Sequence, residues 1–165
     1  MTKLFNERVF SSERAIKIAE EVATEKFCKF RSKLEAIDAG IRVGLAYTTM
    51  GVVSSPLEGF TDLKLGKTSK GEEYFMIYFS GPIRSAGGTA AAFCVVLADY
   101  LREKFGYAKY DPTEQEVKRT ITEILDYHER ITNLQYLPSE KEIEIIARNL
   151  PVQVTGEPSE DKEVS

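Results

Sequence analysis

A glycine-rich segment at residues 80–89, Ser-Gly-Pro-Ile-Arg-Ser-Ala-Gly-Gly-Thr, carries residue types that bind anions. Because it joins a strand-like run to a helix-like run, its backbone N–H groups can converge at a helix N-terminus, where proteins often hold phosphate. The spacing fits neither a Walker loop nor the GxGxxG dinucleotide motif. The alternative is structural, since glycine also permits positive φ and close packing. The candidate phosphate- or DNA-binding residues here are Gly81, Arg84, Ser85, Gly87, Gly88 and Thr89.

A second candidate site is the basic segment at residues 26–33, Lys-Phe-Cys-Lys-Phe-Arg-Ser-Lys, which has four cations and no acid. Cations interleaved with aromatic rings are typical of surfaces that follow a nucleic-acid backbone and stack its bases. The alternative is that Phe27 and Phe30 face the core while the cations are only solvated. The candidate DNA-binding residues here are Lys26, Lys29, Arg31 and Lys33.

The sequence predicts no catalytic residue and no metal-ligand set. Cys28 and Cys94 form no CxxC pair, and with His128 they cannot complete a tetrahedral zinc site unaided. His128 falls on the apolar side of a predicted helix, which favours a hydrogen-bonded core histidine over a catalytic base. Cys94 lies in an apolar run and is expected to be a buried thiol. We therefore expect no cofactor in this chain.

Hydrophobic periodicity predicts the elements that must position these segments. The expected class is α+β, mostly helical, with about five helices around a small, mainly antiparallel β-sheet. The first two helices should form an antiparallel hairpin or one bent helix, and Thr113–Glu116 and Ser139–Glu142 are predicted capping boxes. The expected helices cover residues 12–30, 33–50, 90–105, 113–137 and 139–149, and the expected strands cover 60–65, 73–79 and 152–155.

Length and composition indicate one soluble domain or one piece of a larger protein. The chain has 165 residues and a formal net charge of −4, which excludes a histone-like protein whose whole surface attracts phosphate. We expect a single α+β domain at residues 1–156, followed by an acidic tail or truncated linker at 157–165. The longest apolar run, residues 90–98, is far shorter than the ~18–20 residues that span a bilayer. A cytoplasmic protein without membrane contact is therefore expected.

Several strings together resemble the N-terminal region of the large subunit of archaeal family D DNA polymerase. They are the glycine-rich string at 80–89, Asp-Tyr-His-Glu-Arg at 126–130, Leu-Gln-Tyr-Leu-Pro-Ser at 134–139 and Ala-Arg-Asn-Leu-Pro at 147–151. Gly-Val-Val-Ser-Ser-Pro-Leu-Glu-Gly at 51–59 is a further match, so the resemblance covers most of the chain.

The resemblance implies replication machinery. In that family the large subunit joins a small subunit that carries a 3′–5′ exonuclease, and it polymerises DNA with magnesium-dependent carboxylates much later in the chain. The resemblance therefore implies magnesium for the holoenzyme and none here. The implied partners are the small exonuclease subunit, the remaining large-subunit domains and DNA, with a homo-oligomer as a further alternative.

The resemblance implies that this chain is a non-catalytic module of the large subunit, and two roles follow for it. It could organise the holoenzyme through the helical hairpin and exposed aromatic residues such as Tyr107, Tyr110 and Tyr136, because aromatic residues commonly anchor interfaces. It could also contact the DNA backbone through the glycine-rich loop. The alternative from another class is a free-standing enzyme that binds a nucleotide or other phosphate at Gly81–Thr89.

Overall fold

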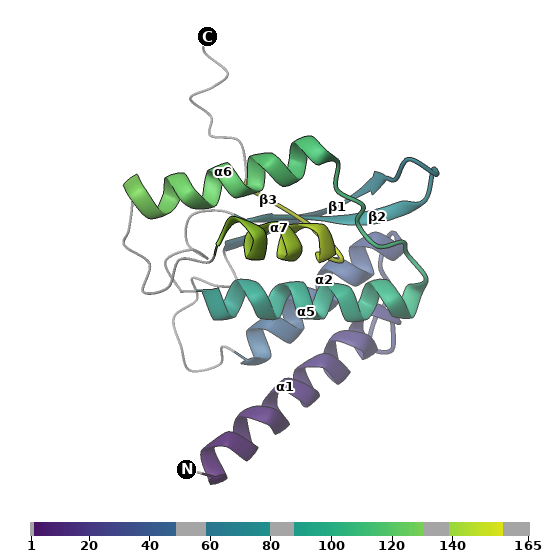
Figure 1. The fold of residues 1–165 in the computed structure, drawn as a ribbon. Coiled ribbons are helices and arrows are strands. Elements are labelled where there is room, and N and C mark those ends of the chain that lie inside the picture. Colours follow the sequence, from purple (N-terminus) through teal and green to yellow (C-terminus); the bar gives the residue numbers. More distant parts are fainter. Residues whose placement is uncertain (1, 49–58, 80–87, 131–138, 157–165) are drawn as a thin grey trace, which may run out of the picture.

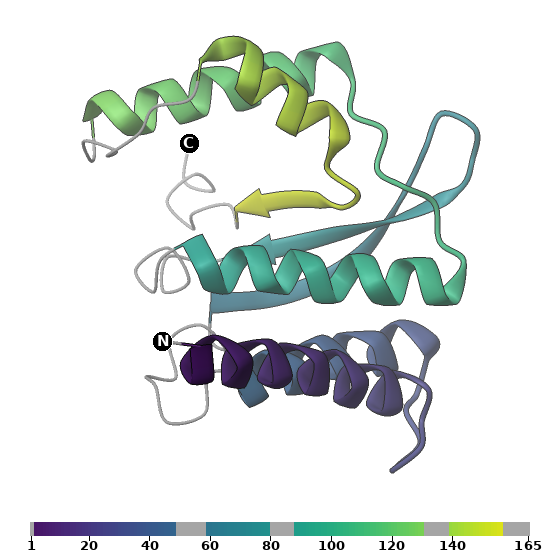
Figure 2. The same ribbon diagram turned by 60° about the horizontal axis from the view of Figure 1, so that its bottom comes forward.

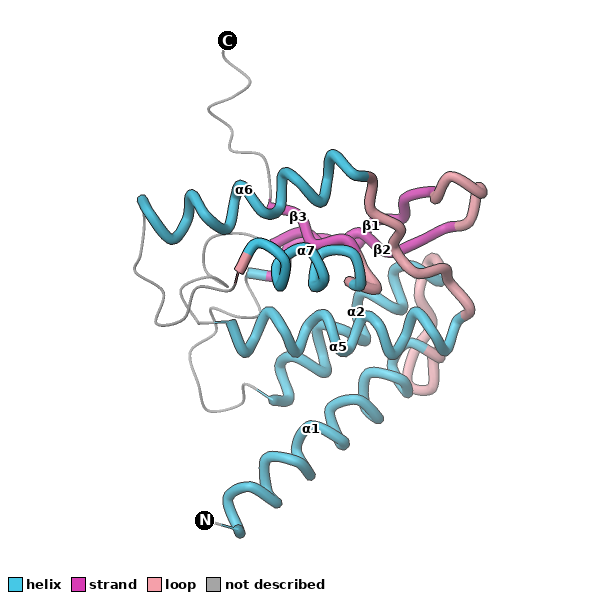
Figure 3. Tube along the Cα trace, in the orientation of Figure 1, coloured by secondary structure: helices cyan, strands magenta, loops and turns pink. Residues whose placement is uncertain are grey.

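The computed structural model describes residues 2–48, 59–79, 88–130 and 139–156. These residues form five helices and three strands (Figures 1 and 3). In chain order they are α1 (Thr2–Ala23), α2 (Lys33–Thr48), β1 (Phe60–Lys67), β2 (Glu73–Phe79), α5 (Gly88–Phe105), α6 (Glu114–Arg130), α7 (Glu140–Asn149) and β3 (Gln153–Gly156). The predicted α+β class is confirmed. None of the described helices is long and apolar enough to cross a membrane.

Helices α1 and α2 pack as an antiparallel hairpin, which confirms one of the two predicted arrangements. Their contact is made by small residues, because a Cβ at Gly40 would meet Ala19 and Ala23, while one at Gly44 would meet Ala15 and Ala19. At Gly40 this Cβ would stand 2.6 Å from the Ala19 carbonyl oxygen. The two backbones thus come so close that only glycine fits at position 40.

The three strands form one mixed sheet in the order β1–β2–β3. The predicted hairpin is confirmed, since β1 pairs antiparallel with β2, and β3 then adds parallel to β2. The parallel pair was not predicted. It is possible because β2 and β3 are separated in the chain by α5, α6 and α7, and parallel strands need such a long crossover.

The start of β1 is tied to α2 by the Arg42 side chain. Its two terminal nitrogens donate to the backbone carbonyls of Phe60 (2.8 Å) and Thr61 (2.9 Å), while its Nε donates to Asp38 (2.6 Å). The guanidinium carbon also lies 4.5 Å from the centre of the Phe60 ring. The ladder between β1 and β2 shifts register at this point, between Phe60 and Asp62.

Helix α5 is the central helix of the described fold, as predicted. It contacts α1, α2 and β2, and in Figure 2 it runs along the sheet, with the α1–α2 hairpin on one side and α6 and α7 on the other. Four of its side chains are fully buried, whereas Val96 is 50% exposed. The buried residues are Cys94, Leu97, Ala98 and Leu101.

Helices α6 and α7 begin at the predicted capping boxes. The Glu116 N–H donates to Thr113 Oγ1 (3.2 Å), and the Thr113 N–H donates to Glu116 Oε2 (2.7 Å), so the first box is complete. The Glu142 N–H donates to the Ser139 hydroxyl (3.2 Å), as an N-cap requires. Arg148 of α7 then holds α6 by donating to both carboxylate oxygens of Glu114, at 2.7 and 2.8 Å.

Three expectations about boundaries and side chains are wrong. The first helix covers residues 2–23 and not 12–30, and Phe27 is 66% exposed and does not face the core. Tyr107 and Tyr110 are half-buried, because their rings pack at 4.8 Å from Phe75 and 5.2 Å from Tyr74 respectively. Because these two rings pack against other residues of the fold, the tyrosines are poor interface anchors. Tyr136 lies outside the described residues.

Candidate functional site

Helix α1 ends in a tight reversal of the chain. The Lys26 N–H donates to the Glu21 carbonyl (3.0 Å) and the Glu25 N–H donates to the Val22 carbonyl (3.0 Å), which is the Schellman pattern. Glu25 occupies the left-handed position of this motif, with φ of 61°. Glycine is usual there, because a side chain in that conformation costs about 1–2 kcal/mol. This reversal is the reason that the helix does not continue to residue 30.

Helix α2 begins at Lys33, after nine intervening residues, and has a cap of its own. The Glu35 N–H donates to the Ser32 hydroxyl (3.1 Å), and the Arg31 N–H donates to the Glu35 carboxylate (3.0 Å). The side chains of Ser32 and Glu35 thus accept hydrogen bonds from backbone N–H groups at the start of α2, much as in a capping box. The basic segment is therefore a loop fixed at both ends.

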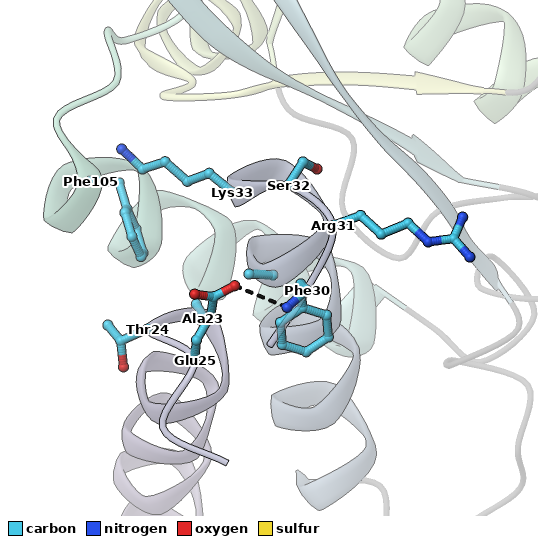
Figure 4. Close-up of a pocket in the computed structure, with 9 residues that line it drawn as sticks. Ala23, Thr24, Glu25, Phe30, Arg31, Ser32, Lys33 and Phe105 are labelled. Atoms are coloured by element: carbon cyan, nitrogen blue, oxygen red, sulfur yellow. Dashed lines mark hydrogen bonds between the residues drawn. The ribbon is translucent and has the colours of Figure 1, made fainter. Parts of the chain in front are cut away.

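The ends of α1 and α5 and the start of α2 surround an open pocket of about 520 Å³ (Figure 4). Ala23 and Ala36 in its lining are buried. Figure 4 shows the Glu25 carboxylate between the rings of Phe30 and Phe105, with Oε1 accepting a hydrogen bond from the Phe30 N–H (3.0 Å). The lining residues are Ala23, Thr24, Glu25, Phe30, Arg31, Ser32, Lys33, Ala36 and Phe105.

The second oxygen of the Glu25 carboxylate accepts no hydrogen bond from the part of the chain that the structure describes. The pocket therefore combines two aromatic walls, a small apolar base and one available acceptor. Such a mixture of apolar surface and a few polar groups is typical of ligand sites.

Of the four predicted cations, Arg31 and Lys33 line this pocket, and the four differ in their contacts. Lys26 forms an ion pair with Glu21 at 2.9 Å. Lys33 holds its ammonium 5.0 Å from the centre of the Phe105 ring and 5.3 Å from that of Tyr107, in cation–π geometry. Lys29 and Arg31 are exposed, and neither forms an ion pair with a described residue. In Figure 4, Lys33 and Arg31 extend in opposite directions from the loop.

The glycine-rich candidate site is largely outside the described residues. Gly81, Arg84, Ser85 and Gly87 fall in the undescribed stretch, while Gly88 and Thr89 open α5. The pocket adjoins Phe105 at the other end of this 18-residue helix, roughly 25 Å away at 1.5 Å per residue. The structure therefore does not bring the start of α5 to the basic loop.

Other candidate groups do not form a reactive cluster where the structure describes them. Cys94 is buried, as predicted, and this burial raises the pKa of its thiol to about 12, while Cys28 is exposed. No group of three or more His, Cys, Asp and Glu side chains among the described residues could hold a metal ion. The His128 side chain is outside the described part of α6, so its predicted role stays a prediction.

Comparison with known proteins places the chain in a family. Residues 2–165 match the family described as DNA polymerase II large subunit DP2, N-terminal. The chain belongs to this family. It is 46% identical over 149 residues to the DNA polymerase II large subunit of Nanoarchaeum equitans, and that alignment covers 90% of the chain and 12% of the relative. The predicted resemblance is confirmed.

Two further DNA polymerase II large subunits give the same result. The Methanosarcina barkeri protein is 44% identical over 162 residues, which is 98% of the chain and 14% of that protein. The Pyrococcus furiosus protein is 40% identical over 153 residues, which is 92% of the chain and 12% of that protein. The chain thus spans about one seventh or less of the DNA polymerase II large subunits that it matches.

Sequence reasoning missed two pocket residues of this large-subunit region. Glu25 was not singled out, because a glutamate gives no sequence signal for the left-handed position at a helix end. Phe105 could not be assigned to the site from the sequence. It stands 72 residues after Lys33, and only the packing of α5 against the hairpin brings the two together.

Proposed function

We propose that this chain is a non-catalytic module of the large subunit of a replicative DNA-directed DNA polymerase. Its role is to assemble with the remaining large-subunit domains and with the small exonuclease subunit, and to contact the DNA backbone. The magnesium-dependent chemistry of the holoenzyme lies in other parts of the large subunit. The family match over residues 2–165, together with the much greater length of the relatives, supports this proposal.

Exposed apolar side chains on α7 and β3 are the candidates for the assembly contact. Ile145 and Ile146 of α7 are 54% and 58% exposed, and Val154 of β3 is 43% exposed. Large exposed apolar patches mark surfaces that another polypeptide covers, and we propose that these three side chains belong to such a patch. The remaining six sevenths of the large subunit is the polypeptide that we propose for this surface.

A binding experiment tests the assembly role. The 165-residue chain is mixed with a polypeptide that contains the rest of the same large subunit, and the complex is measured by size-exclusion chromatography and calorimetry. Ile146→Asp should weaken the complex at least tenfold, because a carboxylate cannot be buried unpaired. Lys141→Ala, at an exposed polar position on the same helix, is the matched control. Absence of a complex with the unmodified chain would refute the assembly role.

The basic loop is the proposed site of DNA-backbone contact. Lys29 and Arg31 are exposed without ion-pair partners among the described residues, so their charges are available to phosphate. Replacing both with alanine should weaken DNA binding and reduce the slope of log affinity against log salt by about two phosphate contacts. Lys70→Ala, in the exposed turn between β1 and β2, is the control and should leave the slope unchanged.

A further inference from the structure

We infer that the pocket between α1, α2 and α5 holds one unpaired base of a single-stranded nucleic acid. The backbone on either side of that base would run along the cations of the loop, so this inference rests on the proposed DNA contact. It adds a binding site for the base itself, with Phe30, Phe105 and Glu25 as the residues that contact it.

The walls of the pocket suit a flat aromatic ligand. Phe30 comes from the loop and Phe105 from the end of α5, and Figure 4 shows them on opposite sides of the Glu25 carboxylate. Unpaired bases bind proteins largely by stacking on such rings. A volume of about 520 Å³ falls within the ~300–1,000 Å³ usual for small-ligand sites and is ample for a nucleoside.

The Glu25 carboxylate supplies a partner for the edge of a base. One of its oxygens accepts from the Phe30 N–H, and this bond directs the carboxylate into the pocket, while the other oxygen is available. Nucleobases present N–H donors on their Watson–Crick edges, and carboxylates accept from them. A phosphate at the same place would be repelled, so the carboxylate selects the base over the backbone.

The backbone conformation at Glu25 is the second observation. Its φ of 61° places a glutamate where glycine would be unstrained. Strain of this kind is concentrated at functional sites, where the side chain is needed. The end of α5 shows that this protein uses glycine in the same motif when no side chain is needed, because Gly106 has φ of 77°.

The rim of the pocket favours nucleic acid over a cationic protein side chain. A lysine or arginine from a partner could also bind between two rings and a carboxylate. Arg31 and Lys33 belong to the lining of the pocket and Lys29 to the same loop, and their like charges disfavour such a side chain. Those cations attract the phosphates that flank a base.

Fluorescence anisotropy on the 165-residue chain tests the inference. Two single-stranded probes of equal length are compared, a DNA 12-mer of mixed sequence and the same backbone with abasic sites in place of bases. The key variant is Glu25→Gly, which removes the carboxylate and keeps the left-handed backbone. Thermal unfolding of each variant checks that it folds.

The unmodified chain should bind the base-containing probe more tightly than the abasic probe. Glu25→Gly should lose about tenfold in affinity for the former and none for the latter, as expected for one hydrogen bond to a charged group. Phe30→Leu should lose about fivefold or more for the base-containing probe alone. Lys29→Ala with Arg31→Ala should weaken both probes equally, because these residues contact phosphate.

Each other outcome overturns the inference in a distinguishable way. If both probes bind equally well, and both bind more weakly when Lys29 and Arg31 are replaced, the base-binding role of the pocket is refuted. The proposed contact with the DNA backbone would then still hold. Tighter binding of both probes by Glu25→Gly would show that the carboxylate only repels DNA. No binding of either probe would refute the DNA contact as well. Glu25-dependent binding of an arginine-rich peptide in place of DNA would assign the pocket to a protein partner.

Discussion

The ends of α1 and α5 border the same pocket and use the same pattern of backbone hydrogen bonds, but they differ in the residue at the left-handed position. In α5 the Tyr107 N–H donates to the Arg102 carbonyl (2.9 Å) and the Gly106 N–H to the Glu103 carbonyl (3.2 Å). In α1 the corresponding position is Glu25. The end of α5 thus has glycine, which the left-handed conformation favours, whereas the end of α1 has a glutamate whose side chain lies in the pocket.

The difference shows that the left-handed backbone conformation is fixed mainly by the hydrogen bonds of the helix end and less by the type of residue at that position. At the α5 end the buried Arg102 side chain adds a further bond to the Tyr107 carbonyl (2.9 Å). At the α1 end the bond from the Phe30 N–H to Glu25 offsets part of the backbone strain. A glutamate in the left-handed conformation is therefore tolerated, and its carboxylate can contact a ligand in the pocket.

The two cysteines give the largest expected contrast between these regions. Cys28 lies exposed in the loop that follows α1, whereas Cys94 is buried in α5. With a pKa of about 12, only ~1 in 10⁴ of the Cys94 thiols is ionised at pH 8, and burial also blocks reagents. We expect Ellman's reagent to modify one thiol per native chain at pH 8 and two in guanidinium. Rapid modification of both in the native protein would show that α5 is not held as described.

Substitution of Gly106 should have the next largest effect. A Cβ at this position would meet no atom within 4 Å, so any loss of stability comes from the backbone conformation alone. We expect Gly106→Val to lower the free energy of unfolding by about 2 kcal/mol, and Gly106→Ala by about 1 kcal/mol. Urea denaturation followed by circular dichroism measures both. If neither variant is destabilised, the end of α5 does not need a left-handed residue.

Position 25 should show the same preference for glycine over alanine, although it carries a glutamate. Glu25→Gly relieves the backbone strain and loses the hydrogen bond from Phe30, so its stability should stay close to that of the unmodified chain. Glu25→Ala loses the bond and keeps the strain, and we expect it to be about 1 kcal/mol less stable than Glu25→Gly. The same urea titrations give the difference. An alanine variant as stable as the glycine variant would contradict the left-handed assignment.

A pH-dependent contact between α1 and α5 should give the smallest effect. The Lys104 ammonium and the Tyr100 hydroxyl hydrogen-bond to Glu20 and hold the pKa of its carboxyl below the usual value. Stability from this group is therefore present above its ordinary pKa near ~4.3 and is lost as the pH falls through the lower folded value. Glu20→Gln should be slightly less stable at pH 7, and the difference should shrink as the pH falls below ~4. A constant difference across this range would assign the effect to packing.

Local signals allowed much of the fold to be predicted. Gly106 after an apolar helix and the Thr113–Glu116 box gave boundaries that the structure confirms, because each acts within one turn of chain. The end of α1 was missed because Glu25 carries no such signal. The parallel pairing of β3 with β2 was also missed, since it depends on packing between segments that are far apart in sequence.

The candidate site was predictable only in part, for the same reason. Residue types and spacing identified Lys29, Arg31 and Lys33 as exposed cations with aromatic neighbours. The pocket additionally requires Phe105, which reaches the loop through the tertiary packing of α5. Sequence therefore indicated the cations and the Phe30 ring and could not indicate the second wall, Phe105.

The contact that Arg42 makes with the start of β1 affects how the sheet behaves toward other molecules. β1 is an outer strand of the sheet, and outer strands can recruit foreign strands and so start aggregation. The guanidinium already donates to the carbonyls of Phe60 and Thr61, so an incoming backbone would have to compete with it for these two acceptors. This end of β1 is thereby protected from unwanted self-association by a residue that belongs to a helix.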